Sequence, residues 1–560
     1  MKSSSLVLMA LLPISILGCS HHAQKPVPVA EPKVVSPVEF ADISQSAGLN
    51  YAWTVTGRRP LSILQTIGNG CALFDYNNDG NLDILLVGTN IGLFKGDGKG
   101  HFTDVSRSMG VAGLHETYLG VACGDIDHDG YDDVYLSGYH CGSLLHNNHG
   151  SSFSDITKSS GIATQPWGTS CAFVETSPGS GILDLIVANY VDFGSDAAKY
   201  PQLCSAHDKM TACGPRYYTA LKPTFYHNDG KGHFRDDSKA NGIAGTSNGK
   251  GLGIVAISLS DDMKPSLAIA NDETAGDLFK PVGKKAYTNV GVETGFAYDR
   301  DGNAHAGMGV DVADYDNDGR FDLVVATYQG EAKSLYHNDG VVFTDQSYMT
   351  GLASSTQAHL SFGVKFVDFD NDGWRDVIFA NGHVEDNVHE IEPSSAYRQQ
   401  CQLLLNRGGT SFQDVTAASG AAFQLPIVGR GLASGDLDND GNMDCLIVDS
   451  EGRPLLLHNL GKESHHWVSL ALTGDKSNRD GYGAVITVTS AGRQLSALCH
   501  ADGSYLSSSD KRVHFGLGDN DAPVSIKIRW PSGLSQSFTS LGVDHEYRIT
   551  EGRNQLDRRP

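Results

Sequence analysis

The sequence lacks any apolar run long enough to cross a bilayer and any excess of positive charge. The apolar run at residues 6–17 has about 12 residues, whereas a spanning helix needs about 20. Lys and Arg number 42 against 65 Asp and Glu, so the net charge is −23. A chain this acidic is a poor candidate for binding nucleic acid, because phosphates are bound by Lys and Arg.

Several motifs of catalysis and cofactor attachment are also missing. The sequence has no C-x-x-C-H for covalent haem, no H-E-x-x-H zinc helix and no Walker loop. Hydrophobic residues make up 40% of the chain, which is enough for a packed core, so the acidity does not indicate disorder. The acidic residues are therefore either a solvated surface or ligands of a cation.

The first 18 residues predict an exported lipoprotein. The apolar run ends at Ile16, Gly18 and Cys19, which resembles a bacterial lipobox, a signal in which the Cys is diacylated and becomes the new N-terminus. Ser20 after this Cys favours the outer membrane, with the periplasmic and surface faces both open. The alternative is an ordinary signal peptide in which Cys19 occurs by chance.

Residues 19–37 predict an extended tether between the membrane and the folded part. This stretch is rich in proline, which favours polyproline-like chain: Pro26, Pro28, Pro32 and Pro37. We expect contact with the membrane through the lipid only.

One nine-residue phrase, D-x-[DN]-x-D-G-x-x-D, organises the rest of the chain because it recurs five times. Positions 1, 3, 5 and 9 carry oxygen side chains: Asp75, Asn77, Asp79 and Asp83; Asp125, Asp127, Asp129 and Asp133; Asp314, Asp316, Asp318 and Asp322; Asp368, Asp370, Asp372 and Asp376; Asp436, Asp438, Asp440 and Asp444. Position 7, where the backbone carbonyl would be the ligand, varies: Asn81, Tyr131, Arg320, Trp374 and Asn442.

This spacing predicts about five calcium sites. Calcium takes six to eight oxygen ligands, and side chains at alternate positions of a tight loop converge on one point. An EF-hand does not fit, because it needs Glu at position 12 and flanking helices, whereas position 12 of the first loop is Leu86 and short aliphatic strands follow. Metal-free Asp-Gly turns are the other alternative, and five copies of four ligand positions argue against it.

The repeats predict an all-β chain with a seven-bladed β-propeller over residues 38–462. A second phrase, F-x-D-x-[ST], recurs in step with the loops, and the unit of about 50 residues suits a four-stranded blade. Five blades carry good loops. Two degenerate blades, at residues 171–187 and 251–271, lie between the second and third loops, and we leave metal binding there open. Residues 40–49 should pair with the last blade and close the ring.

Residues 463–560 predict a small β-sandwich-like domain, because residues 467–472, 485–488 and 524–530 alternate apolar and polar side chains. The loop Gly503-Ser504-Tyr505 could bind a ligand, although a satisfied turn is the simpler interpretation.

The two parts resemble known families. The blades look like FG-GAP/VCBS repeats of the type found in integrin α-chains. The tail looks like an ASPIC/UnbV domain at residues 478–484, 503–507, 514–518 and 529–533. Together they resemble bacterial relatives of cartilage acidic protein. The resemblance implies calcium binding and an adhesion or scaffold role.

Two function classes remain open. The first is a binding, adhesion or scaffold module for a protein or glycan at the cell envelope. The second is an envelope enzyme acting on a glycan or phosphoester at the channel mouth; a candidate loop holds His383, Asp386 and His389, although a polar rim loop is the simpler interpretation. Cys204 and Cys213 flank an insertion and could form a disulfide in an exported protein.

Overall fold

The computed structural model describes residues 35–196, 198–283 and 285–559. Residues 36–560 form one compact unit. Cys19 and nearly all of the predicted tether lie outside the described residues. Among the described residues, no helix has the length and apolar character needed to cross a membrane.

The prediction of an all-β propeller followed by a β-sandwich-like domain is confirmed. The described residues form seven four-stranded antiparallel sheets between Phe40 and Asn459. Their strands, innermost first, are β2 (Cys71–Phe74), β3 (Asp83–Leu86), β4 (Gly92–Gly96) and β5 (Phe102–Asp104) in blade 1; β6 (Tyr118–Gly124), β7 (Asp133–Gly138), β8 (Gly142–Asn147) and β9 (Phe153–Asp155) in blade 2; β10 (Gly168–Val174), β11 (Asp184–Asn189), β16 (Thr224–Asn228) and β17 (Phe234–Asp236) in blade 3; β18 (Gly251–Ser258), β19 (Pro265–Asn271), β20 (Asp277–Val282) and β21 (Ala286–Asn289) in blade 4; β22 (Val310–Ala313), β23 (Asp322–Val325), β24 (Ser334–Asn338) and β25 (Phe343–Asp345) in blade 5; β26 (Ser361–Val367), β27 (Asp376–Asn381), β28 (Gln402–Asn406) and β29 (Phe412–Asp414) in blade 6; and β30 (Gly429–Gly435), β31 (Asp444–Asp449), β32 (Leu455–Asn459) and β1 (Phe40–Asp42) in blade 7.

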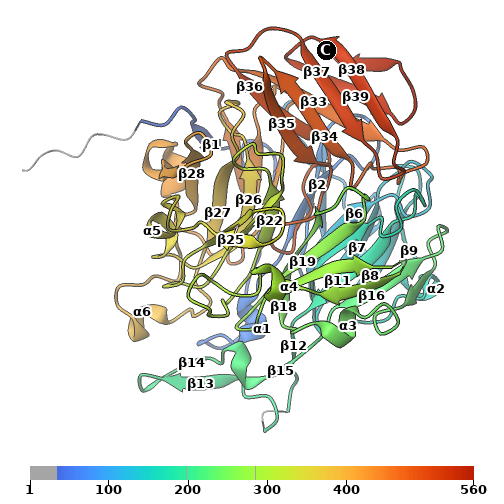
Figure 1. The fold of residues 1–560 in the computed structure, drawn as a ribbon. Coiled ribbons are helices and arrows are strands. Elements are labelled where there is room, and N and C mark those ends of the chain that lie inside the picture. Colours follow the sequence, from blue (N-terminus) through green and yellow to red (C-terminus); the bar gives the residue numbers. More distant parts are fainter. Residues whose placement is uncertain (1–34, 197, 284, 560) are drawn as a thin grey trace, which may run out of the picture. The chain divides into compact units, whose positions relative to one another are not determined.

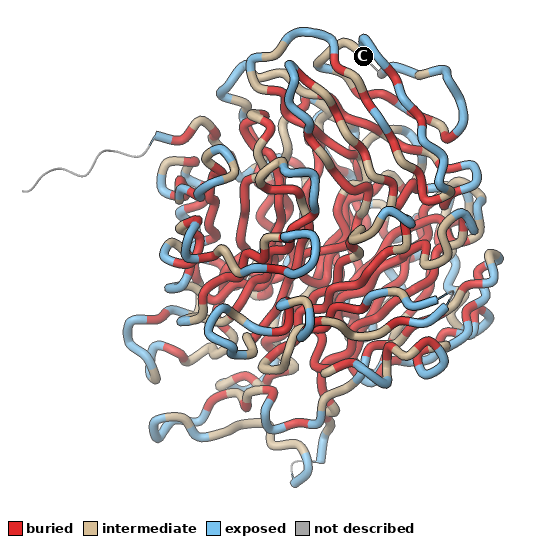
Figure 2. The backbone as a smooth tube through the Cα atoms, in the orientation of Figure 1, coloured by how far each residue is buried: buried red, intermediate tan, exposed pale blue. Residues whose placement is uncertain are grey.

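The sheets follow one another around a ring (Figure 1). Each innermost strand contacts the innermost strand of the next sheet, and β30 contacts β2. β1 pairs antiparallel with β32, with Phe40 opposite Asn459, so the N-terminal strand completes the last sheet. Each pair of neighbouring sheets shares a buried apolar cluster; Leu73 of blade 1, for example, shares one with Leu446 of blade 7. Burial is accordingly concentrated between the sheets (Figure 2).

The F-x-D-x-[ST] phrase links the outermost strand to its neighbour in the blades that carry it. In blade 1 the Asp104 carboxylate accepts hydrogen bonds from the backbone N–H (2.9 Å) and hydroxyl (2.5 Å) of Ser106. The Ser106 hydroxyl in turn accepts a hydrogen bond from the Leu93 N–H on β4 at 2.9 Å. The same hydrogen bonds recur in blades 2, 3 and 5, which explains why the phrase repeats with the blades.

The tail contains two four-stranded sheets over a common core. One sheet has the order β36-β33-β39-β40 and the other β35-β34-β37-β38. Their bounds are β33 (His466–Thr473), β34 (Val485–Ser490), β35 (Arg493–Leu498), β36 (Val513–Gly518), β37 (Val524–Arg529), β38 (Ser535–Leu541), β39 (His545–Thr550) and β40 (Leu556–Arg559).

Short elements complete the described chain. Blade 3 contains an insertion between its second and third strands. In it, β12 (Val191–Asp192) pairs with β15 (Thr219–Ala220), and between them β13 (Leu203–Ala206) and β14 (Lys209–Ala212) form a hairpin. The helices are α1 (Ile63–Thr66), α2 (Thr157–Ser160), α3 (Ile243–Thr246), α4 (Gly291–Thr294), α5 (Leu352–Thr356) and α6 (Val388–Ile391), with 3-10 turns at Val111–Gly113, Pro215–Tyr217, Thr416–Ala418 and Ala421–Gln424.

The tail loop at residues 501–510 fills the centre of the ring. Its backbone bonds to Cys71 and Leu73 of blade 1, Val121 of blade 2, Ile254 of blade 4 and Val310 of blade 5. It also bonds to Ser170 of blade 3 and Ser434 of blade 7. The Tyr505 ring packs against the Phe362 ring of blade 6, with 4.9 Å between the centroids and an interplanar angle of 58°. All seven innermost strands therefore hold this loop, which we call the plug.

The fit of the plug is close. A Cβ atom at Gly70 would lie 1.7 Å from the carbonyl oxygen of Leu506, so no other residue fits there without displacing the plug. Tyr505 and Leu506 are fully buried, and the Tyr505 hydroxyl donates to the Ile67 carbonyl at 2.8 Å. The sequence suggested a turn whose polar groups bond within the loop. The polar groups of this loop instead bond to the propeller.

Candidate metal centres and the docking of the tail

The five Asp-rich loops share one backbone conformation. Each joins the innermost strand of its blade to the second strand. The glycine at position 6 has φ between 84° and 92° in every copy: Gly80, Gly130, Gly319, Gly373 and Gly441. The residue at position 4 also has positive φ, between 57° and 66°: Asn78, His128, Asn317, Asn371 and Asn439. Asn, which predominates there, tolerates this conformation better than most residues.

The side chains at positions 1 and 5 hold this conformation. In the loop of blade 6, the Asp368 carboxylate accepts the N–H groups of Asp372 (3.1 Å) and Gly373 (2.8 Å). Asp372 accepts the N–H of Trp374 at 2.8 Å. The other four loops repeat this arrangement with distances between 2.7 and 3.2 Å.

The aspartate at position 9 ties the loop to the third strand of the blade. In blade 5, Asp322 accepts the N–H of Tyr315 at 3.2 Å and that of Asn338, on β24, at 2.8 Å. Asp83, Asp133, Asp376 and Asp444 make the equivalent pair of bonds. This residue therefore has a structural role that is separate from any metal.

The loop side chains converge closely enough to hold a cation. One ligand atom from each of Asp314, Asp316 and Asp318 lies within 4.8 Å of the others, and Asp125, Asp127 and Asp133 form a second such group. The position 3 residues supply the test of fit. The Oδ1 atoms of Asp127, Asp370 and Asp438 are buried and accept no hydrogen bond from the described residues. A buried carboxylate oxygen without a partner is costly, so these oxygens suit a metal ligand set.

Burial raises the pKa of Asp314, Asp436 and Asp438 in these loops, and neighbouring carboxylates raise it further. The pKa of Asp314 is raised to about 8 by burial, with Asp322 and Asp316 adding to the shift. The pKa of Asp436 is likewise raised to about 8 and that of Asp438 to about 6. A divalent cation among these oxygens would oppose both causes.

Histidines on the third strand lie beside three of these groups, and sequence reasoning missed them. His337 on β24 lies 3.2 Å from Asp322 and 3.3 Å from Asp316. His146 and His458 stand equivalently beside Asp133 and Asp444, and hydrogen bonds to these carboxylates raise the pKa of each histidine to about 9. The signal was a His-Asn pair that ends the third strand in four blades, at positions 146, 227, 337 and 458.

The described side chains at position 7 make contacts of their own, which differ from loop to loop. Arg320 pairs with Asp318 of its own loop and donates to the Asn338 carbonyl at 2.5 Å. Trp374 packs under the guanidinium of Arg493 at 4.9 Å, and Asn442 donates to Asp440. Their identity varies because only their backbone belongs to the shared loop.

Acidic residues of the degenerate blades 3 and 4 contact the tail, one of them buried and the other exposed. Glu175 is buried and accepts the N–H of Gly181 at 2.9 Å and both the N–H and the Nδ2 of Asn478 at 2.8 Å. In blade 4, Asp261 pairs with Arg529 at 2.6 Å. In these two blades, which lack the full metal-binding pattern, residues of the tail bond to the carboxylates.

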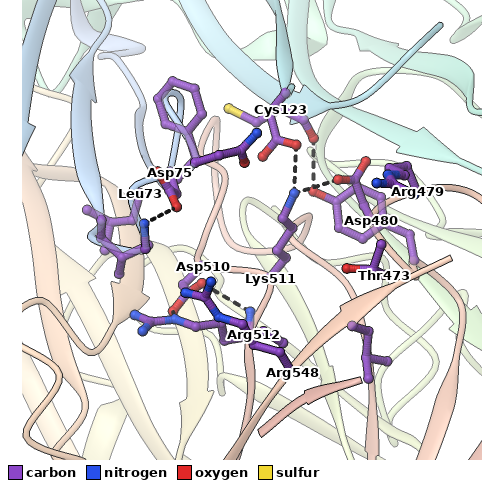
Figure 3. Close-up of a pocket in the computed structure, with 18 of the residues that line it drawn as sticks. Leu73, Asp75, Cys123, Thr473, Arg479, Asp480, Asp510, Lys511, Arg512 and Arg548 are labelled. Carbon is purple, nitrogen blue, oxygen red and sulfur yellow. Dashed lines mark hydrogen bonds and ion pairs between the residues drawn. The ribbon is translucent and has the colours of Figure 1, made fainter. Parts of the chain in front are cut away.

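The tail also rests on the Asp-rich loops themselves. Arg493 reaches the carbonyls of Asp372 and Gly373 at 3.2 Å, and Arg512 donates to the Asp436 carbonyl at 2.7 Å. Lys511 lies between Asp132 and Asp480 at 2.6 and 2.5 Å (Figure 3). Lys511 and Arg512 line a cavity of ≈310 Å³, together with Asp132, Asp480 and Asp75 of the first loop.

The candidate catalytic loop does not form an acid-base site around His383. The imidazole is buried, its Nδ1 accepts the N–H of Glu385 at 3.0 Å, and burial together with Arg430 lowers its pKa to about 3. Asp386 forms an ion pair with Arg59 at 2.9 Å, and His389 lies in α6.

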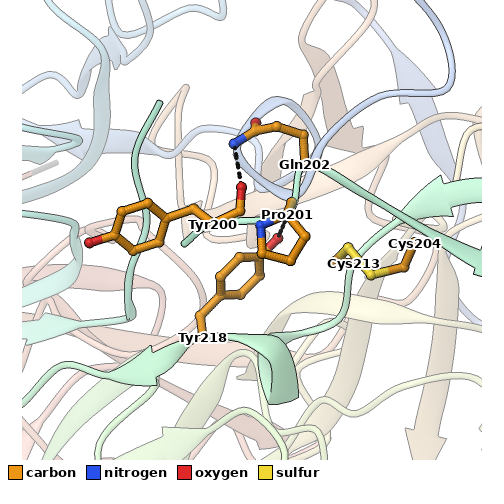
Figure 4. Close-up of a disulfide and its surroundings, with 6 residues drawn as sticks. All are labelled: Tyr200, Pro201, Gln202, Cys204, Cys213 and Tyr218. Carbon is orange, nitrogen blue, oxygen red and sulfur yellow. Dashed lines mark hydrogen bonds between the residues drawn. A yellow bond between two sulfur atoms is a disulfide. The ribbon is translucent and has the colours of Figure 1, made fainter. Parts of the chain in front are cut away.

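The structure joins Cys204 and Cys213 in a disulfide, as the sequence suggested (Figure 4).

One short match to the hydrolase pattern G-x-S-x-G occurs at residues 245–249. Its Ser247 follows α3 instead of linking a strand to a helix, which is the context that pattern needs. The Ser247 hydroxyl is buried and donates to Asp277 at 2.6 Å. The match therefore has a structural explanation.

Family models match both parts of the chain. The FG-GAP-like repeat matches residues 75–136 and 314–379, and ASPIC and UnbV matches residues 474–556. The chain therefore carries FG-GAP-like repeats in its propeller and an ASPIC and UnbV domain in its tail. Repeats of this kind on a propeller favour a binding or scaffold module.

The chain is similar in sequence to cartilage acidic protein 1. It is 24% identical to the protein of Xenopus tropicalis over 83% of this chain and 70% of the relative, and 23% identical to that of Homo sapiens over 87% and 72%. Among solved structures, the BP39L lectin from Burkholderia pseudomallei aligns with a TM-score of 0.40 at 12% identity, over 70% of this chain and 95% of the lectin.

Proposed function

We propose that this chain is an exported, calcium-binding β-propeller that acts as a binding or scaffold module at the cell envelope. The observation that carries the proposal is the set of five loops with one backbone conformation, in three of which a buried carboxylate oxygen at position 3 lacks a hydrogen-bond partner among the described residues. Oxygen side chains of these loops converge closely enough to hold a cation. Calcium is the ion that suits them, because it accepts six to eight oxygen ligands in flexible geometry.

The ion would bring positive charge to the point where the side chains at positions 1, 3, 5 and 9 meet. The residues themselves do the rest: positions 1 and 5 fix the turn, and position 9 links it to the third strand. A loop held in this way presents its backbone carbonyls to Arg493 and Arg512 of the tail. Ion binding would therefore support the docking of the tail on the propeller.

The remaining sequence expectations enter as part of the same proposal. Residues 1–18 are the lipoprotein signal, residues 19–37 the tether, residues 38–462 the propeller and residues 463–560 the ASPIC/UnbV-like domain. The lipid on Cys19 holds the chain at a membrane, with the outer membrane favoured. The partner is a protein or glycan of the envelope, since the charge of −23 opposes nucleic acid.

The enzyme alternative draws no support from the centre of the ring. On the tail side the plug occupies that position and bonds to the innermost strands. His383, the residue that suggested acid-base chemistry, is buried and bonded to the backbone. A binding role needs neither an open channel nor a reactive group.

Removal of calcium is the decisive experiment. We expect the melting temperature to rise in 2 mM calcium and fall in EDTA, because an ion that binds only the folded chain stabilises it by about 2.7 kcal/mol per site at 100 times its Kd. Elemental analysis after dialysis should give about five calcium ions per chain. An unchanged melting temperature in both conditions, with no bound metal, would contradict the proposal.

A further inference from the structure

The Asp-rich loop of blade 6 differs from the other four in its burial. No residue of this loop, 368–376, is exposed. Each of the other four loops, all of which the structure describes, has at least one exposed residue: Asn78 and Asp79; His128; Asp318, Gly319 and Arg320; Asp440. An ion held in the blade 6 loop would therefore be enclosed, whereas in the other loops it would lie beside solvent.

The tail covers the blade 6 loop. His465, which directly precedes β33, donates from Nδ1 to the Asp370 carbonyl at 2.6 Å. The backbone N–H of Gly518, at the end of β36, donates to the Asn371 carbonyl at 2.7 Å. Two separate strands of the tail thus bond to the loop backbone at positions 3 and 4.

A third strand of the tail bonds to the next two positions. Arg493, the first residue of β35, donates to the carbonyls of Asp372 and Gly373 at 3.2 Å each. Its guanidinium also lies over the ring of Trp374 at 4.9 Å from the centroid. The carbonyls of four successive loop residues are therefore bonded to the tail.

The fit between β36 and the loop is close. The Asn371 side chain donates from Nδ2 to the Gly441 carbonyl at 3.0 Å, and its Oδ1 accepts the Nε2 of His514 at 2.6 Å. A Cβ atom at Gly516 would lie 2.2 Å from Oδ2 of Asp368, the residue at position 1. Any side chain at residue 516 would therefore push β36 away from the loop.

The cover is also tied to the centre of the ring. Along the chain, β36 closely follows the plug at residues 501–510, which bonds to the innermost strands of the propeller. β36 cannot rise from the loop without pulling on the plug. Opening of such a unit breaks many buried contacts at once, so it is rare in the folded chain.

The side chain at position 3 suits an ion inside this enclosed loop. Asp370 is 7% exposed, and its buried Oδ1 lacks a hydrogen-bond partner among the described residues. The N–H of Asp372, which lies nearby, donates to Asp368 at 3.1 Å. A buried carboxylate oxygen in this position is costly unless a cation lies beside it.

We propose that the tail is a lid over the metal site of blade 6, so that the ion bound there is occluded and leaves only when the tail lifts. This inference rests on the proposed calcium binding and goes beyond it, because it divides the ions into two classes. Ions in blades 1, 2, 5 and 7 exchange with the solution while the tail stays docked. The ion in blade 6 is held inside the folded chain.

Isotope exchange at constant calcium tests this proposal. The full chain is saturated with radioactive calcium and diluted into millimolar unlabelled calcium, and the label retained by the chain is counted over time. We expect most of the label to exchange in a fast phase. One ion per chain should exchange at least about 100-fold more slowly, because its release waits for the opening of a packed element.

Two variants assign the slow ion to blade 6. Asp368→Ala should abolish the slow phase, because it removes a ligand of the enclosed loop. Asp314→Ala is the same change in the blade 5 loop, which has exposed residues, and should reduce the fast phase only.

Two further variants loosen the lid without altering a ligand. Gly516→Ala places a methyl group against Asp368, and Arg493→Ala removes two hydrogen bonds to the loop; each should accelerate the slow phase about tenfold or more. Gly542→Ala is the control for the first, because a Cβ there has its nearest contact at 3.6 Å. Arg529→Ala is the control for the second, because Arg529 bonds to blade 4 instead. Neither control should change the slow phase.

Thermal melts in calcium establish that each variant is folded, and Arg493→Ala, at an exposed residue, covers the case in which Gly516→Ala fails to fold. Exchange of all bound ions in one fast phase would overturn the proposal. So would a slow ion that survives Asp368→Ala, or one that neither lid variant accelerates. A chain that binds no label at the start contradicts the calcium proposal as well, which distinguishes the two failures.

Discussion

The aspartates of the repeated loop differ in burial and in the cost of carrying a charge. Position 1 is almost fully buried in blade 6, where Asp368 is 1% exposed, and both of its oxygens accept backbone N–H groups. Burial and the carboxylates of Asp372 and Asp370 raise the pKa of Asp368 well above its usual value. Its charge is therefore costly without a cation and favourable with one.

This balance gives a prediction for Asp368→Ala. The variant should hold one calcium ion fewer by elemental analysis, because the remaining oxygens of that loop make a poor ligand set. It also loses two hydrogen bonds to the loop backbone, worth about 1 kcal/mol each. The loss of stability, measured by denaturant unfolding, should be larger in calcium than in EDTA, since removing the carboxylate relieves repulsion when no ion is present.

Glu175→Ala and Asp261→Ala are the comparison for that variant. Glu175→Ala leaves the buried donors of Gly181 and Asn478 without a partner and should cost about 2–3 kcal/mol, with the calcium content unchanged. Asp261 is 99% exposed, so its replacement should change neither quantity. Equal calcium loss in all three variants would show that good and degenerate blades do not differ in metal binding.

The convergence of the loop side chains could be predicted from the sequence because these residues are local. Positions 1, 3, 5 and 9 lie within nine residues, and their spacing alone makes them converge. His337 could not be placed in the same way, because its distance from Asp316 depends on the pairing of β23 with β24. The role of Glu175 was also out of reach, because its partner Asn478 is 303 residues away.

The plug shows the same limit at the scale of an element. Its sequence, Gly503-Ser504-Tyr505, reads as a turn, and nothing local indicates that Tyr505 enters a ring of seven strands. Seven blades and the closing strand β1 were predictable, because the repeats and their count are visible in the sequence. The position of the tail on that ring was not, since it rests on single contacts such as Lys511 with Asp132.

Tyr505 should therefore be important for stability. Tyr505→Phe removes one hydrogen bond to Ile67 and should cost about 1 kcal/mol in the free energy of unfolding. Tyr505→Ala leaves a cavity against Phe362 and should cost about 3–5 kcal/mol. Denaturant unfolding measures both. Met210→Ala, at a side chain that is 49% exposed, is the control and should stay within about 0.5 kcal/mol. A Tyr505→Ala variant as stable as that control would mean that the plug is not seated in solution.

At the scale of the whole molecule, the two ends of the ring differ in character. One end carries the Asp-rich loops and the tail, whose Arg493 and Arg512 bond to the loop carbonyls. The other carries the disulfide hairpin β13–β14, which lines a cavity of ≈350 Å³. If Cys19 is lipidated, the lipid and the tether alone should attach the folded part of the chain to the membrane.

The last prediction concerns that anchor. Lipid chains contribute about 0.8 kcal/mol per buried CH₂, and stable anchoring takes more than one chain, which a diacylated Cys19 provides. Cys19→Ala should block lipidation and leave unprocessed precursor, detected by mass and by the absence of labelled fatty acid. A shortened chain that begins at Ser36 behind a cleavable signal should be soluble, folded and loaded with calcium, because residues 36–560 form one compact unit and the chain is strongly acidic. Fractionation measures this: the shortened chain should appear in the soluble fraction. If it still sediments with membranes after a high-salt wash, the anchor lies in the propeller or the tail, and the tether has no part in holding the chain at the envelope.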